Sequence, residues 1–264
     1  MSTTTSSTCS VSAPWRHVPC ELDAGPTSRA AIGLITLPND VTIETELRSF
    51  LPLDGVCVLA TRIPLPVQGT VDSLRSMEQH LTQAAALIAP ESGLDVIAYG
   101  CTSGSMAIGP DVVERRIKAA RPEVACANPV SSALKALRLL DCTRIAVLNP
   151  YSDEVNEVVG NHVTSQGFDI VASASFKQIG DRRITRVPPD AIFDAGLDLA
   201  GRSDVEALFI SCTALRVSPI IDRLEAALGK PVVSSNQALA WDCLRLSGCH
   251  EPILGFGQLL AQAG

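Results

Sequence analysis

Two stretches decide the fold of this 264-residue sequence: LDVIAYGCT at residues 94–102 and VEALFISCT at residues 205–213. Each begins as an apolar run typical of a buried strand. Each then ends in a small residue followed by Cys-Thr, which places Cys101 and Cys212 at matched positions. An apolar strand that recurs with the same polar end predicts an internal repeat.

Further landmarks recur in the same order on either side of these stretches. An apolar segment begins at Ile32 in the first copy and at Ile145 in the second, at a similar distance before each cysteine. Beyond the cysteines, a short strand leads to Asn128 in one copy and to Asn236 in the other, and a helical pattern follows each. The repeat therefore predicts two similar halves related by a pseudo-two-fold axis.

Short apolar runs alternate with amphipathic stretches from residue 30 onward. We expect strands at residues 31–37, 55–61, 94–99, 144–148, 169–174, 207–210 and 231–234, with helices at 71–88, 112–121, 131–139, 152–166, 190–201, 218–228 and 238–246. This alternation predicts an α/β fold: two Rossmann-like halves with parallel sheets and the active site between them. The expected domains are a flexible tail (1–28), a first half (29–128 plus 235–264) and a second half (129–234).

Composition excludes several classes of protein. Hydrophobic residues make up 46% of the chain and charged residues 19%, which excludes a wholly disordered chain. The net charge of −7 argues against nucleic-acid binding, and no apolar run is long enough to span a membrane. The N-terminus lacks a secretory signal, so we expect a cytoplasmic protein whose nine cysteines stay reduced. Their spacing fits no zinc site, and we expect no metal.

The two Cys-Thr pairs are the candidate catalytic groups. Each lies where a strand ends, and backbone N–H groups at a helix start can hold a carboxylate and lower the pKa of a thiol. Because parallel sheets bind ligands at this edge, two facing halves would bring Cys101 and Cys212 to one cleft. A buried, inert cysteine is the alternative at either position, and the matched repeat argues against it. The hydroxyl residues beside them are candidate substrate ligands: Thr102, Ser103 and Thr213.

Other strand ends carry polar side chains as well. Asn39 and Asp40 follow the first strand, and Tyr151 and Ser152 follow its counterpart. These residues can hold a substrate, although Asp40 and Ser152 can equally cap a helix. Arg62 ends the second strand and can either bind a carboxylate through two hydrogen bonds or form a surface ion pair. The sequence contains neither a G-x-G-x-x-G fingerprint nor a Walker-type loop.

The sequence resembles the aspartate/glutamate racemase superfamily over about residues 30–260, within its maleate isomerase and arylmalonate decarboxylase branch. It is most similar there to ectoine-utilisation proteins. The stretches that carry the resemblance are IAYGCTSG (97–104), LFISCTALR (208–216), KPVVSSNQ (230–237), WDCLRL (241–246) and GFG (255–257). The resemblance implies that Cys101 and Cys212 are catalytic, that Tyr151 contacts the substrate, that no cofactor is used and that the protein is a homo-oligomer.

Two departures from the branch bear on the reaction. Maleate isomerases carry Asn at the position of Asp40, where an aspartate would repel a second carboxylate but could hold an ammonium group. Arylmalonate decarboxylases keep only the second cysteine, so the presence of Cys101 argues against decarboxylation. We therefore predict a racemase or epimerase of a small amino-acid-type carboxylate in ectoine breakdown. One thiolate would take the α-proton, and the other thiol would deliver a proton to the opposite face.

Two alternatives remain at this point. In a maleate-type cis–trans isomerase, Cys101 would add to a double bond and Cys212 would supply a proton. In a non-catalytic binding protein, the two-lobed scaffold would only hold a small carboxylate, and neither thiol would be required.

Overall fold

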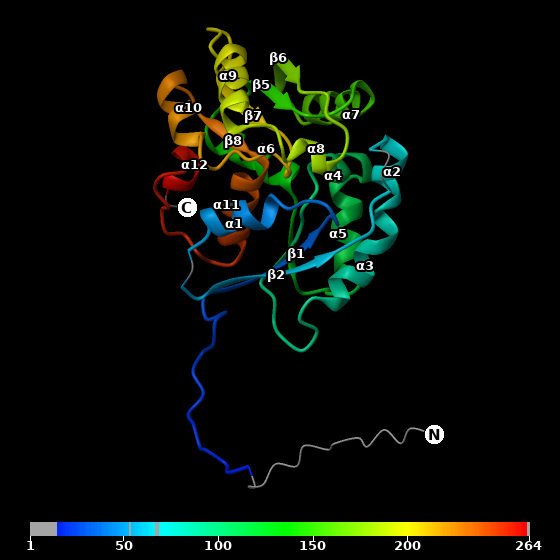
Figure 1. Cartoon of the computed structure of the whole chain (residues 1–264), viewed down its shortest axis with the longest axis vertical. Helices are drawn as coiled ribbons and strands as arrows, with labels where there is room; N and C mark the ends of the chain where they lie inside the picture. The colour runs from blue at the N-terminus through cyan, green and yellow to red at the C-terminus, as the bar shows by residue number, and fades with distance from the viewer. Residues whose placement is uncertain (1–14, 53, 67–68, 263–264) are drawn as a thin grey trace, which may run out of the picture.

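The computed structural model describes residues 15–52, 54–66 and 69–262 and contains two four-stranded parallel sheets (Figure 1). The first has the order β2 (Val56–Arg62), β1 (Ala30–Thr36), β3 (Val96–Tyr99), β4 (Ala125–Ala127). The second has the order β6 (Asp169–Ser175), β5 (Arg144–Asn149), β7 (Ala207–Ile210), β8 (Val232–Ser234). The strand order is the same in both sheets, which confirms the predicted α/β fold with two similar halves.

Helices follow most of the strands and cover the sheets. They are α1 (Ile43–Phe50), α2 (Val71–Ser76), α3 (Glu78–Leu87), α4 (Thr102–Ile108), α5 (Pro110–Lys118), α6 (Pro129–Leu139), α7 (Asp153–Ser165), α8 (Asp181–Ile184), α9 (Pro189–Ala200), α10 (Ile221–Leu228), α11 (Ser235–Leu246) and α12 (Gly257–Ala261). Because the central strands are covered, β1, β3 and β7 are buried along their whole length, as their continuous apolar sequences indicate. No helix in the described part of the chain is long and apolar enough to cross a membrane.

Helix α11 packs against elements of both sheets. It contacts α1 and α6, and it also touches β3, β4 and β8. Figure 1 shows it between the first sheet, in the lower part of the view, and the second sheet above. The domain boundaries expected from the sequence stay a prediction. Of the expected tail, residues 1–14 lie outside the described part, and residues 15–25 form no helix or strand.

The helix expected at residues 71–88 is divided at Met77. Helix α2 is capped by Thr70, whose hydroxyl accepts a hydrogen bond from the N–H of Ser73. The hydroxyls of Ser73 and Ser76 donate back to carbonyls three residues earlier, which competes with regular helical hydrogen bonding. Met77 is fully buried beneath this break.

The expected equivalence of Asn128 and Asn236 is wrong in detail. Asn128 is the N-cap of α6 and accepts the N–H of Ser131. In the second copy the N-cap is Ser234, which forms a capping box with Gln237, so α11 starts earlier than expected. Asn236 therefore lies in the first turn of α11 and serves tertiary contacts.

A buried carboxylate, Glu46 of α1, ties the first half of the chain to the loop after β7. Its Oε1 accepts the N–H groups of Val217 and Ser218 at 2.6 and 2.7 Å. Its Oε2 accepts the side-chain amide of Asn236 at 3.0 Å, and the same amide donates to the carbonyl of Thr213. Burial raises the pKa of Glu46, while these donors lower it. The carboxylate therefore fixes the loop that follows Cys212.

We predict that Glu46→Gln lowers the free energy of unfolding by about 2–3 kcal/mol, because the new amide turns a donor toward buried N–H donors. The measurement is urea unfolding. Glu44→Gln is the matched control, since Glu44 forms a partly exposed ion pair with Arg62, and it should cost less than about 1 kcal/mol. Equal losses in the two variants would contradict this role of Glu46.

Candidate active site

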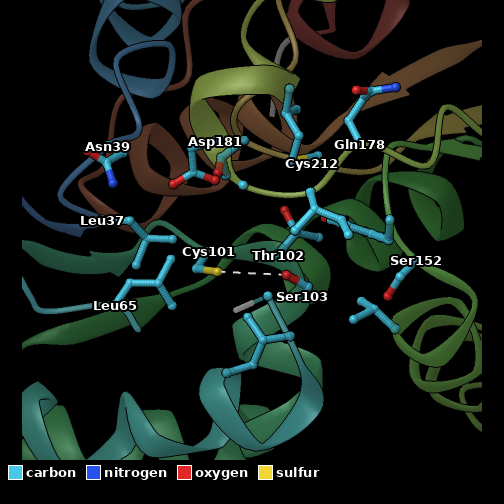
Figure 2. Close-up of a pocket in the computed structure, with 18 of the residues that line it drawn as sticks. Leu37, Asn39, Leu65, Cys101, Thr102, Ser103, Ser152, Gln178, Asp181 and Cys212 are labelled. Atoms are coloured by element: carbon cyan, nitrogen blue, oxygen red, sulfur yellow. Dashed lines mark hydrogen bonds between the residues drawn. The ribbon is translucent and has the colours of Figure 1, made fainter. Parts of the chain in front are cut away.

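A cavity of about 280 Å³ lies at the carboxyl-terminal ends of both sheets. Loops that follow β1, β2, β3, β5, β6 and β7 line it, as expected for ligand sites in parallel sheets. Apolar side chains such as Leu37, Leu65 and Val155 form part of the wall. Both Cys101 and Cys212 also line it, one from each half of the chain (Figure 2). The predicted meeting of two thiols at one site is thus present in the structure.

Cys101 is the N-cap residue of α4. Its Sγ accepts a hydrogen bond from the N–H of Gly104 at 3.3 Å and lies 3.9 Å from the hydroxyl of Ser103. Gly104 permits this approach, because an added Cβ would lie 2.9 Å from Cys101 Sγ and 2.5 Å from the hydroxyl of Tyr99. The first turn of the helix can therefore reach the thiol only with glycine at this position.

Cys212 follows β7 and is 7% exposed. Tyr151, from the loop after β5, lines the same cavity and is also 7% exposed. Burial raises the pKa of Tyr151 well above its usual value. Its hydroxyl lies close enough to Cys212 and Ser211 for both to affect its pKa, but it makes no hydrogen bond of ordinary geometry in the described part of the chain. The protonated phenol can therefore donate to a bound molecule.

Both thiols are held in their protonated form. Burial raises the pKa of Cys101 to about 12, although the Gly104 N–H lowers it, and the nearby carboxylates of Asp181 and Asp40 raise it further. Burial and the same carboxylates raise the pKa of Cys212. The helix start was expected to lower the thiol pKa, and this expectation is wrong because desolvation outweighs one backbone N–H.

A single buried hydroxyl, that of Ser235, joins the two Cys-Thr loops. It accepts the N–H of Cys212 at 3.1 Å and the hydroxyl of Thr102 at 2.9 Å. Ser235 is the first residue of α11 and is fully buried. The two loops are therefore positioned by one group rather than independently.

Five of the remaining predicted site residues line the cavity: Asn39, Thr102, Ser103, Tyr151 and Thr213. Ser152 lines it too, and its side chain makes no capping hydrogen bond to α7.

Asp40 and Arg62 lie outside the cavity lining. Asp40 is fully buried, and its Oδ1 accepts the N–H groups of Thr42 and Ile43 at the start of α1, although the N-cap residue of this helix is Thr42 and not Asp40. Arg62 donates to the carbonyls of Leu37 and Asp40 and forms an ion pair with Glu44, which matches its ion-pair alternative. The guanidinium is therefore occupied by the loop between β1 and α1.

Sequence reasoning missed Asp181, the carboxylate that lines the cavity. Its Oδ2 is buried and has no hydrogen-bond partner among the described residues. Burial and the charge of Asp40 raise the pKa of Asp181 to about 6. In sequence it sits in an Asp-Arg-Arg run typical of a solvated surface, so only the chain's path after β6 brings it to the site. Elsewhere in the described residues, no group of three or more His, Cys, Asp or Glu side chains could hold a metal ion.

Comparison with known proteins gives one consistent family. The family model described as arylmalonate decarboxylase matches residues 39–260. The maleate isomerase of Nocardia farcinica is 28% identical over 244 residues, covering 88% of this chain and 95% of that protein. The crystal structure of the maleate isomerase Iso from Pseudomonas putida S16 has a TM-score of 0.81 at 19% identity, covering 89% and 99% of the two chains. A cysteine-to-serine mutant of the Nocardia enzyme, with a covalently bound succinylcysteine intermediate, has a TM-score of 0.81 at 24% identity, with the same coverage.

We predict that Gly104→Ala displaces the Cys101 thiol and lowers its rate of modification by a small alkylating agent. The variant should also lose about 1–3 kcal/mol of stability from overpacking. Gly160→Ala is the control, because Gly160 lies in the middle of α7 and an added Cβ would meet open space. Its free energy of unfolding should rise by up to about 1 kcal/mol. Mass spectrometry of the alkylated peptides and urea unfolding are the measurements. Unchanged alkylation of Cys101 in Gly104→Ala would refute the close-approach argument.

We also predict a pH-dependent effect of Asp181→Asn. The raised pKa means that the folded state holds this proton more tightly than the unfolded chain. The protonated Asp181 therefore stabilises the folded state. This stabilisation is complete below about pH 4 and is lost as the pH rises through about 6. Relative to wild type, Asp181→Asn should therefore gain about 2–3 kcal/mol between pH 4 and pH 8. Urea unfolding at both pH values tests this, with the 84%-exposed Asp190→Asn as control. The same difference from wild type at both pH values would count against the prediction.

Proposed function

The chain belongs to the arylmalonate decarboxylase family, and from this premise we propose that it is a cofactor-independent cis–trans isomerase of the maleate type, acting on a small unsaturated carboxylate. The observation that carries the proposal is the pair of thiols, Cys101 and Cys212, on the wall of one small cavity. The solved relative with a succinylcysteine intermediate supports a covalent route, because a succinyl group on sulfur is the product of thiol addition to a four-carbon double bond. A cavity of about 280 Å³ suits a substrate of this size.

In the proposed reaction, Cys101 adds to the double bond. The S–C bond forms at one olefinic carbon, the π bond breaks, and the other carbon takes a proton from Cys212. The proton that leaves Cys101 replaces the one that Cys212 gives. Rotation about the resulting single bond is followed by the same steps in reverse: Cys212 gives its proton back to the sulfur of Cys101 as the S–C bond breaks, Cys212 takes a proton from the neighbouring carbon, and the trans double bond forms. No atom is gained or lost.

The polar wall supplies the binding groups in this proposal. The side chains of Asn39, Thr102, Ser103, Tyr151 and Thr213 line the cavity and would hold the carboxylate oxygens. Backbone N–H groups at the start of α4 would stabilise negative charge that develops on the carboxylate during addition. Charge stabilisation of this kind matters here, because both thiols start protonated.

One observation favours a second candidate, a racemase or epimerase of an amino-acid-type carboxylate. The carboxylate of Asp181 lines the cavity, and that of Asp40 lies behind it; an ammonium group would complement this charge. Here one thiolate takes the α-proton and the opposite thiol returns a proton to the other face. A role in ectoine breakdown, a cytoplasmic location and a homo-oligomeric state also stay predictions.

The two reactions predict different outcomes for the single cysteine variants. For the cis–trans isomerase, Cys101→Ala should abolish both turnover of maleate and the covalent adduct, while Cys212→Ala should retain the adduct on Cys101 and turn over slowly. For the racemase, each variant should lose racemisation but still exchange the α-proton of one enantiomer in heavy water.

NMR in heavy water and intact-protein mass spectrometry measure these outcomes. Cys126→Ala, outside the cavity, is the control and should behave as wild type. Full activity of both Cys101→Ala and Cys212→Ala would refute the two-thiol proposal.

A further inference from the structure

A second hollow adjoins the cavity that Cys101 and Cys212 line. It is a groove of about 440 Å³, formed by the segment between β6 and α9, and its lining includes Phe176, Arg183, Arg186, Val187 and Pro188. Gln178 lines both the groove and the cavity, and Figure 2 shows it on the same side of the cavity as Asp181. Helix α8 separates the two hollows, because Asp181 and Ile184 line the cavity while Arg183 lines the groove. We call the second hollow the arginine groove.

The arginine groove is positively charged. The side chains of Arg183 and Arg186 are exposed, and neither forms an ion pair or a hydrogen bond with another described residue. No carboxylate lines the groove in the part of the chain that the structure describes. The neighbouring acids are placed elsewhere: Asp181 lines the cavity, and Asp190 lies 3.8 Å from Arg223. Two guanidinium groups without an acidic partner in one hollow provide the donors that carboxylates bind.

The short segment that carries the two arginines is anchored on its other side. Ile184 and Val187 are buried, and Arg216 donates a hydrogen bond to the carbonyl of Val187 at 3.1 Å. The N–H of Arg186 donates to the carbonyl of Arg183 at 3.1 Å, which closes a turn between them. Side chains three residues apart in such a turn lie on the same side of it. The interior therefore holds this segment so that both guanidinium groups face the groove.

An anionic substrate meets negative charge on its way to the thiols. The chain has a net charge of −7, Asp181 lines the cavity, and Asp40 is buried behind it. Arg182 is the only cationic side chain in the cavity wall among the described residues, and it is exposed. Like charges slow the approach of an anion, whereas a local patch of opposite charge raises its concentration at the entrance. The arginine groove is a patch of this kind beside the cavity.

We propose that the arginine groove is an entry site for small carboxylates, in which Arg183 and Arg186 bind the anion before it passes α8 into the cavity. This deepens the proposed function and rests on it in one respect, since it assumes a carboxylate substrate. The two arginines take no part in the chemistry at the thiols. Because both are exposed, their hold on the anion is weak and sensitive to salt, which allows its transfer into the cavity.

The test compares two reagents that differ in charge but little in size: iodoacetate is an anion, and iodoacetamide is neutral. Mass spectrometry of the peptides measures the rate at which each reagent alkylates Cys101 and Cys212. The ratio of the two rates is the readout, because a change in thiol reactivity affects both reagents alike and cancels. The double variant Arg183→Gln/Arg186→Gln should lower the iodoacetate-to-iodoacetamide ratio about three- to tenfold at low ionic strength. In about 0.5 M salt the difference from wild type should fall below about twofold.

Two further double variants serve as controls. Arg48→Gln/Arg115→Gln removes the same charge from exposed positions on α1 and α5, outside both hollows, and should leave the ratio within about twofold of wild type. Arg183→Lys/Arg186→Lys keeps the charge in the groove and should retain at least about half of the wild-type ratio.

Several outcomes would overturn the entry site. They are an unchanged ratio in Arg183→Gln/Arg186→Gln, an equal fall in the control that lacks Arg48 and Arg115, and alkylation of the thiols by iodoacetamide alone in the wild type. A fall in the lysine variant as large as in the glutamine variant would assign the effect to the shape of the segment and would also overturn it. Turnover of maleate is measured separately. A wild-type protein that does not isomerise maleate but shows the expected ratios would contradict the proposed function and support the entry site.

Discussion

The hydroxyl of Ser235 is the constraint on which the site depends. The two thiols come from loops that are far apart in the sequence, and each loop follows a strand of a different sheet. Their relative position would vary with any movement between the sheets unless something held both. Ser235 accepts hydrogen bonds from both loops, and α11, which begins with Ser235, packs on elements of both sheets. Glu46 adds a second tie to the loop after Cys212. The spacing of the thiols is therefore a property of the buried interior.

The electrostatics of the cavity favour the protonated form of both thiols. Burial and the carboxylates of Asp181 and Asp40 keep both thiols protonated. Asp181 itself forms no ion pair with a protein cation among the described residues. Because the thiolate is the form that oxidises, the raised pKa values of these two buried thiols also protect them from oxidation.

Much of the fold was predictable, because buried parallel strands have continuous apolar sequences and the internal repeat shows the same order of strands twice. All seven strands expected at stated positions are present, within about two residues at their ends. Helix α1 is absent from the expected helices, and only the capping alternative at Asp40 pointed to it. Ile43, Leu47 and Phe50 have helical spacing, but the pattern covers only two turns beside a polar loop. The break between α2 and α3 at Met77 could not be predicted, because the serine hydroxyls that bond to backbone carbonyls there do not interrupt the helical spacing of apolar residues. At the site, matched Cys-Thr pairs identified the thiols, whereas Asp181 and Ser235 act through tertiary position that no local pattern records.

The topology has a consequence for how such a protein can change. Every loop that touches the cavity leaves a sheet at its carboxyl-terminal end, whereas the packed interior lies along the strands beneath. Substitutions at loop positions such as Asn39 can therefore change the cavity wall without repacking the interior. Gly104 and Ser235 do not share this freedom, because each touches a reactive loop and the buried interior at once. Sequence changes that alter the cavity wall would therefore occur in the loops, while Gly104 and Ser235 stay unchanged.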